Sequence, residues 1–143
     1  MSLIGKTAEV RLSACTPDTT DPVPFSLDGF PPVLANSLSN SARLTALMEL
    51  AAARLIQPHL PDGQSTVSVE MDVTHLVPAV QGELRAVASY LGTNGRLHHF
   101  RVHAFDETGL VGSAEHTRAV VVPKRLLAGA RRRAGRPAML LNV

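Results

Sequence analysis

The sequence predicts one α+β domain, in which a long helix packs against an antiparallel sheet. Three observations lead to this prediction. The chain has 143 residues, enough for a single domain with a sizeable core. One long segment, rich in Ala and Leu, has the composition of a helix. The segments that follow it are strand-like and are separated by turn signals.

The composition narrows the class of protein. Hydrophobic residues make up 45% of the chain and charged residues 18%, which favours a globular protein over a disordered one. No run reaches the ~20 apolar residues of a membrane span, and the first residues lack the apolar stretch of a signal peptide. The single cysteine, Cys15, excludes an internal disulfide and a multi-cysteine zinc site. We expect a cytoplasmic protein with neither a metal nor a cofactor.

The first quarter of the chain contains a strand and a long connection. Residues 6–14 alternate between apolar and polar and predict a strand. Residues 16–40 hold five of the ten prolines and predict an irregular connection. Connections of this length in compact domains are usually lids, binding loops or disordered segments. Because Phe25 and Phe30 lie in it, we expect a flap that packs over a ligand.

The predicted helix covers Ser41–Gln57, with an N-cap among residues 39–41, and ends before Pro58. It is hydrophobic nearly all round, which is typical of a buried helix. Glu49 lies in its middle, and an isolated carboxylate is costly to bury.

Two interpretations of Glu49 remain open. Its carboxylate could pair with Arg43, Arg54 or an arginine on a strand. Alternatively it is a catalytic carboxylate, whose orientation is set by the apolar wall and by the small residues one turn away.

The remainder of the chain predicts a meander of strands and a basic tail. The strand-like segments are 65–73, 82–92, 96–106 and 110–122. Asn94-Gly95 is a strong hairpin signal, and Asp106–Gly109 marks the next turn. The last 21 residues carry six of the 14 basic residues and no acid, so residues 1–122, with eight basic and 12 acidic residues, have a net charge of −4. We therefore divide the chain into a domain, 1–122, and a basic tail, 123–143, which could begin with a short helix.

Histidines on the predicted strands are further candidates. His75 follows a polar stretch at a strand end, where it is either structural or able to supply a proton or orient a carbonyl. His99 and His103 share a strand face with Arg101 between them, while His98 lies on the other face. A cation between two histidines favours a solvated face over a metal site.

His116 and Arg118 share a face of the last strand. One interpretation is a salt-bridged outer face. In the other, Arg118 meets an anionic or carbonyl partner and is the better functional candidate of the two.

Three blocks of sequence, in order and at characteristic spacing, carry a family resemblance. They are Thr45-Ala-Leu-Met-Glu49, Val73-Thr-His75-Leu-Val-Pro78 with the Gly82 strand after it, and Asp106-Glu-Thr-Gly-Leu-Val-Gly112 running into Glu115-His-Thr-Arg118. Together they resemble the hotdog-fold thioesterases, and within them the fluoroacetyl-CoA thioesterase type. The resemblance covers about Ser39 to Val122.

The resemblance implies a hydrolase of acyl-CoA thioesters with a long helix wrapped by an antiparallel sheet. It also implies a dimer formed through the sheets, with the active site at the subunit interface. The family's Thr, Glu and His correspond to Ser41, Glu49 and His75, and its late arginine corresponds to Arg118. Ser68 stands where the family has a glycine near the substrate carbonyl, which narrows that corner or adds a hydrogen bond.

The leading hypothesis is a homodimeric acyl-CoA thioesterase in which Glu49 is the general base or the nucleophile. His75 orients or protonates, Ser41 positions the thioester, and Arg118 holds the carbonyl or a water. Ser41 and Glu49 are eight residues apart, about 12 Å along a straight helix, so they contact different parts of one substrate or are completed by the other subunit.

Two other functions remain open. A hotdog protein that binds acyl-CoA without hydrolysis is one, and Ser68 is the feature that favours it. The other is a module that binds nucleic acid or an anionic surface through the basic tail. The low aromatic content and the lack of a recognition motif count against it.

Overall fold

The computed structural model describes residues 2–12, 41–79 and 82–135, with only the backbone described at residues 41 and 42. In chain order the elements are β1 (Thr7–Leu12), α2 (Ser41–Ile56), the short 3-10 helix η1 (Gln57–His59), β2 (Ser65–His75), β3 (Leu84–Asn94), β4 (Leu97–Asp106), β5 (Gly109–Val121) and α3 (Pro123–Ala134). The predicted flap with Phe25 and Phe30 lies outside the described residues, as does Cys15.

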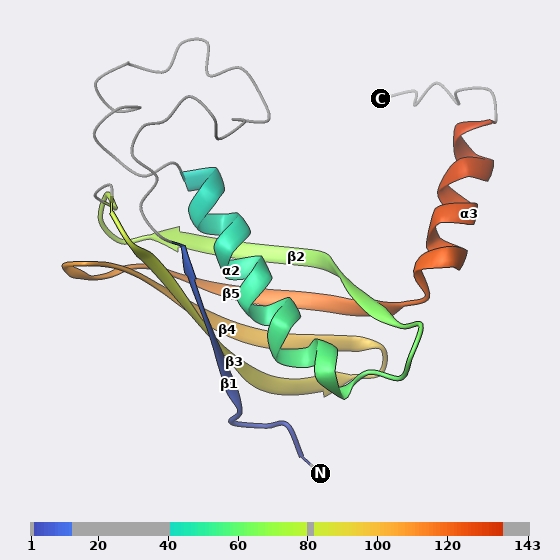
Figure 1. Ribbon diagram of the computed structural model, residues 1–143, viewed down its shortest axis with the longest axis horizontal. Helices are drawn as coiled ribbons and strands as arrows, with labels where there is room; N and C mark the ends of the chain where they lie inside the picture. Colours follow the sequence, from blue (N-terminus) through green and yellow to red (C-terminus); the bar gives the residue numbers. More distant parts are fainter. Residues whose placement is uncertain (1, 13–40, 80–81, 136–143) are drawn as a thin grey trace.

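The five strands form one sheet in the order β1-β3-β4-β5-β2, and all neighbouring strands are antiparallel. Helix α2 runs along one face of this sheet (Figure 1). The predicted α+β architecture, a long helix against an antiparallel sheet, is confirmed. Strands β1 and β2 are the two edges of the sheet within the described part of the chain.

Helix α2 buries one regular stripe of side chains. Its buried residues recur at the spacing of a single helix face: Leu44, Leu47, Met48, Ala51, Ala52, Leu55 and Ile56. Among the described residues nothing covers the opposite face, and Leu50 is 40% exposed. Within this part of the chain the prediction of a helix buried all round is therefore wrong, because the sheet covers only one side of α2.

Small residues on the sheet allow α2 to approach closely. Ala86, Ala88 and Ala104 are fully buried on the inner face, beside the larger Phe100. On β5, a Cβ at Gly112 would lie 3.3 Å from the Thr74 carbonyl oxygen and 3.7 Å from Leu44 Cδ2. A Cβ there would be tight against the Thr74 carbonyl of β2 and in van der Waals contact with Leu44 of α2.

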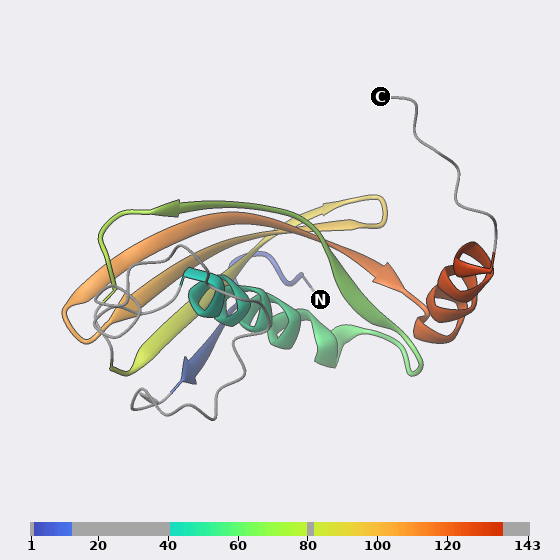
Figure 2. The same ribbon diagram turned by 90° about the horizontal axis from the view of Figure 1, so that it is seen from above.

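The sheet curves around the helix (Figure 2). Three breaks in strand register accompany the curvature. They lie between Ser68 and Glu70 on β2, between Tyr90 and Gly92 on β3, and between Leu110 and Gly112 on β5. Bulges bend a strand and increase its local twist. The sheet is thus shaped to wrap α2 rather than to lie flat beneath it.

The turns differ in detail from those the sequence predicts. The β3–β4 hairpin forms, but β3 continues through Asn94 and the turn is at Gly95-Arg96. Gly95 has φ +63°, as a first central residue of a two-residue hairpin turn requires. At the β4–β5 turn, Asp106 Oδ1 accepts hydrogen bonds from the backbone N–H groups of Thr108 (2.8 Å) and Gly109 (3.1 Å).

After β5 the chain enters α3, which lies beyond the end of the sheet (Figures 1 and 2). Pro123 occupies a first-turn position, and none of the helix residues is buried. The last turn contains Arg131, Arg132 and Arg133. Among the described residues, no helix has both the length and the apolar character needed to cross a membrane.

The face assignment on β4 predicts two very different substitution costs. Phe100→Ala removes a fully buried ring and is expected to lower the free energy of unfolding by about 3–5 kcal/mol. Arg101→Ala removes an exposed ion pair with Glu115 and is expected to cost at most about 1 kcal/mol. Urea unfolding of both variants checks this, and similar costs would contradict the assignment.

Candidate active site

The centre of the candidate site is a buried arginine. Arg118 lies on β5 beneath α2 and is only 7% exposed. Its Nε donates to Thr66 Oγ1 at 2.8 Å and its Nη2 donates to the Thr66 carbonyl oxygen at 3.0 Å. A third bond runs from Nη1 to His116 Nε2 at 3.1 Å. A guanidinium has five N–H groups, so two remain for a carboxylate or a substrate oxygen.

His116 supports this arginine in a defined protonation state. An arginine can only donate, so His116 Nε2 must accept from it. His116 Nδ1 therefore carries the proton and donates to the Glu70 carbonyl oxygen at 2.8 Å. The pKa of His116 is lowered, and burial is the largest cause. The hydrogen bond to the Glu70 carbonyl opposes this lowering, the charge of Arg118 adds to it, and the charge of Glu49 opposes it least. The ring is held as the neutral Nδ1–H tautomer.

A salt-bridged outer face for His116 and Arg118 is therefore wrong. His116 is 2% exposed and, like Arg118, points to the helix side of the sheet. The sequence holds a signal for this, because Glu115 and Thr117 alternate with the buried Ala114, His116 and Arg118 along β5. The interpretation as an outer face rested on the polar character of His116 and Arg118 and gave too little weight to this alternation.

Glu49 lies at the border of the buried stripe of α2 and is half-buried. Its negative charge raises the pKa values of both His116 and Arg118, opposing the lowering that burial causes in each. The charge of this carboxylate thus acts on both side chains. Among the arginines that the sequence offered as partners, the charge of Glu49 acts on a strand arginine, Arg118, and both interpretations of Glu49 stay open.

His75 occupies the far end of β2 and is exposed. The sequence suggested that the strand ends at residue 73, before the polar residues next to His75. Instead, β2 continues through His75, which lies opposite Gly112 of β5. Leu44 of α2 lies above Gly112, so His75 is close to the first turns of the helix. Ser41 is the first residue of α2, and its side chain lies outside the described part of the structure.

The remaining candidate, Ser68, is opposite Arg118 in the β2–β5 register, beside the bulge of β2. It is exposed. Thr66, which was not among the candidates from the sequence, is buried two residues earlier on the same strand face and bonds to Arg118 twice. The period of two from Ser68 to Thr66 is the signal that could have identified it.

The candidate residues occupy two regions of one strip along α2 and β2. Ser41 and Glu49 are separated by about 12 Å along the helix. On β5, Gly112, opposite His75, and His116 are separated by about 13 Å. One region therefore contains Ser41 and His75, and the other contains Glu49 with Arg118. The roles predicted for these residues stay predictions.

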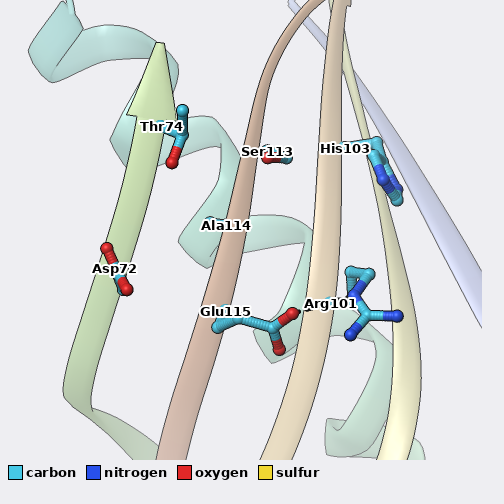
Figure 3. A pocket seen from close by; sticks show the side chains of 7 residues that line it. All are labelled: Asp72, Thr74, Arg101, His103, Ser113, Ala114 and Glu115. Atoms are coloured by element: carbon cyan, nitrogen blue, oxygen red, sulfur yellow. Dashed lines mark hydrogen bonds and ion pairs between the residues drawn. The ribbon is translucent and has the colours of Figure 1, made fainter. Parts of the chain in front are cut away.

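The other face of the sheet contains a shallow hollow unrelated to Glu49. Figure 3 shows it in front of the strands, with α2 behind them. The residues lining it are Asp72, Thr74, Arg101, His103, Ser113, Ala114 and Glu115. Across this hollow Arg101 Nε donates to Glu115 Oε1 at 2.8 Å. Arg101 and Glu115 are exposed, in line with the solvated face predicted for this histidine-bearing strand.

No group of three or more His, Cys, Asp or Glu residues in the described ranges is placed to hold a metal ion. In particular, His99 does not combine with His103 in such a group. Instead, its Nδ1 lies 3.1 Å from Thr117 Oγ1 on the neighbouring strand.

A long helix on a curved antiparallel sheet is the architecture of the hotdog proteins. The structure superimposes on that of the fluoroacetyl-CoA thioesterase FlK with a TM-score of 0.78 and 25% identity, covering 94% of this chain and 97% of the other. A hot-dog-like protein from Thermanaerovibrio acidaminovorans gives a TM-score of 0.75 with 21% identity over 94% of each chain. The predicted hotdog fold is confirmed.

Sequence comparison identifies the family. Residues 22–124, well over half of the chain, match the sequence model of the fluoroacetyl-CoA-specific thioesterases. The chain belongs to this family. The fluoroacetyl-CoA thioesterase of Streptantibioticus cattleyicolor is 33% identical over 99 residues, which are 64% of this chain. The match spans 63% of that relative's length, somewhat less than two thirds.

The support of Arg118 by Thr66 leads to a stability prediction. Thr66→Val removes Oγ1 and leaves the buried Arg118 Nε–H without its acceptor, so we expect the free energy of unfolding to fall by about 1–3 kcal/mol. Ser65→Ala is the matched control, because its hydroxyl bonds to Gln57 in an exposed position and should cost about 0.5 kcal/mol or less. Equal costs in thermal unfolding would show that Thr66 does not hold Arg118.

Proposed function

We propose that the protein hydrolyses an acyl-CoA thioester to a free acid and CoA, with Glu49 as its essential carboxylate. The observation that carries this proposal is the position of Glu49, which is half-buried on the helix and whose charge acts on the buried guanidinium of Arg118. Membership of a thioesterase family supports it. In addition, a variant of FlK has been solved in complex with acetyl-CoA.

The chemistry needs a group that activates the attacking atom and a group that stabilises the oxyanion. As a general base, Glu49 would take a proton from water as the water oxygen attacks the thioester carbon. As a nucleophile, it would form an acyl anhydride that water then hydrolyses. In both cases negative charge develops on the carbonyl oxygen. The two N–H groups of Arg118 that its protein partners leave over can stabilise this charge.

His75 and Ser41 complete the proposal at the other end of the strip. The CoA thiolate leaves as the tetrahedral intermediate collapses, and His75 is proposed to orient the substrate or protonate the leaving sulfur. Ser41, at the first residue of α2, is proposed to position the thioester near the positive end of the helix dipole. Ser68, opposite Arg118, would border the acyl group.

We further propose that the active unit is a homodimer formed along β2. This strand has 11 residues and is a free edge of the sheet within the described chain. Long free edges are normally covered or paired. Exposed apolar side chains gather on the elements around it, including Leu50 on α2, Val69 on β2, and Leu76 and Val77 after it. Antiparallel pairing of two β2 strands would place the partner's His75 on the same side of the sheet as Glu49.

The substrate's acyl group and the outer parts of the chain belong to the same proposal. The segment 16–40, with Phe25 and Phe30, is proposed to cap the acyl group. The domain 1–122 would carry the activity and the basic tail 123–143 would not be required for the chemistry. A cytoplasmic location remains part of the proposal and rests on the composition.

Glu49→Gln tests the central assignment. The amide keeps the shape of the side chain but cannot accept a proton or attack, so kcat is expected to fall by about 10²–10⁴-fold with the fold retained. The measurement is thiol release from short, long, aryl and halogenated acyl-CoAs. Glu115→Gln is the matched control on the outer face, where its partner is Arg101, and should keep full activity. Turnover retained in Glu49→Gln would refute the assignment. Tight binding without turnover by the wild type would instead indicate a binding protein.

Val69→Asp tests the proposed interface. Val69 is 54% exposed on the edge strand, and a buried carboxylate at a paired edge would be strongly unfavourable. We expect the molar mass from light scattering to halve and turnover to fall with it. Ile4→Asp is the control, because Ile4 is 67% exposed and lies outside β2. A dimer that survives Val69→Asp would rule out pairing along this edge.

A further inference from the structure

We propose that His116 is a positioning residue that holds Arg118 in place only while its imidazole is neutral, and that protonation of His116 sets an acidic limit on turnover. This inference rests on the proposed function, because it assigns the role of Arg118 in that reaction to a hydrogen bond from its neighbour. His116 itself is too deeply buried to touch water or substrate directly.

The hydrogen bonds of His116 leave it one working protonation state. Nδ1–H donates to the Glu70 carbonyl oxygen at 2.8 Å, and the lone pair of Nε2 accepts from Arg118 Nη1 at 3.1 Å. Nδ1 is thus bonded to the backbone at the bulge of β2, and Nε2 is bonded to the guanidinium of Arg118. Rotation of the ring would break both bonds.

Protonation removes the acceptor that Arg118 needs. An imidazolium carries N–H donors at both nitrogens, so Nε2–H would face the Nη1–H of a second cation at hydrogen-bond distance. Arg118 would then keep only its two bonds to Thr66 and would be pushed out of line by like-charge repulsion. Misplacement of an oxyanion-binding group by about 1 Å can cost on the order of 10²-fold in rate.

The charged and titratable side chains around His116 lie on α2, β5 and β4. The charge of Glu49 on α2 favours protonation of His116, while the charge of Arg118 on β5 opposes it. On β4, the neighbouring Phe100 ring is 6.2 Å from the imidazole, centre to centre, and His98 lies in register with Arg118. Strand β2 contributes the Glu70 carbonyl. Burial also lowers the pKa of His98, so both histidines on this face favour the neutral form.

The linkage has a definite sign. The pKa of His116 in the folded protein lies below its ordinary value of about 6.5, so between those two values the unfolded chain binds more protons. The free energy of unfolding therefore falls as the pH drops below about 6.5, and the loss is complete below the folded-state pKa. His98 contributes with the same sign.

Glutamine provides a test variant because its amide can donate to Glu70 and accept from Arg118 without titrating. His116→Gln should keep the turnover of acetyl-CoA or fluoroacetyl-CoA near that of the wild type at pH 8 and extend it to lower pH. His116→Ala should lower kcat about 10–100-fold at every pH while circular dichroism shows a retained fold. His99→Gln, on the outer face beside Thr117, is the control and should leave the pH profile unchanged.

Two results would overturn the inference: a decline of turnover at low pH that is identical in wild type and His116→Gln, or turnover in His116→Gln as low as in His116→Ala.

A second measurement is independent of turnover. In ¹⁵N-histidine NMR spectra, His116 should show the neutral Nδ1–H form at pH 7, and His116→Gln should weaken the pH dependence of unfolding. If the wild type hydrolyses no acyl-CoA, the proposed function fails, and these spectra alone decide the role of His116; an imidazolium at pH 7 would refute it.

Discussion

Burial of the Arg118 guanidinium beneath the helix is the constraint on which the rest of the site depends. An unpaired charge in an apolar interior is very costly, so a buried guanidinium needs hydrogen-bond acceptors within the protein. Thr66 supplies two acceptors and neutral His116 supplies the third. These bonds tie β2 to β5 below α2. Among the described residues, Glu49 is the carboxylate whose charge acts on this guanidinium.

The same constraint explains the irregular geometry of β2. The bulge between Ser68 and Glu70 lies next to the position opposite Arg118, and the Glu70 carbonyl accepts the proton of His116. Bulges re-aim side chains and carbonyl groups near functional sites. Here the bulge also contributes to the curvature that wraps the sheet around α2 (Figure 2). The bulge of β2 therefore contributes both to the geometry of the site and to the curvature of the sheet.

Most of the fold could be predicted from the sequence because it depends on local patterns. The helix spacing of Leu44 to Ile56 and the period of two in β4 and β5 each determine which face is buried. The site was harder to predict. Glu49, His75 and Arg118 stood out by residue type, but the partnership of Arg118 with Thr66 joins residues 52 positions apart. Register across a sheet depends on bulges and turns, and the β3–β4 turn fell later than Asn94-Gly95 suggested. Single-sequence patterns do not specify such shifts.

The open side of α2 connects the fold to the proposed chemistry. The sheet covers one stripe of the helix, while Leu50, directly after Glu49, remains exposed together with apolar residues on and after β2. In the described part of the chain, these apolar groups and the outer edge of β2 are left open to water. A second copy along β2 would cover them and enclose Glu49 in a drier cleft, where interaction with the Arg118 charge and with a developing oxyanion becomes stronger. The separation of about 12 Å between Ser41 and Glu49 on one helix then ceases to be an obstacle. In such a dimer each subunit would need to supply only part of the groups that surround one thioester.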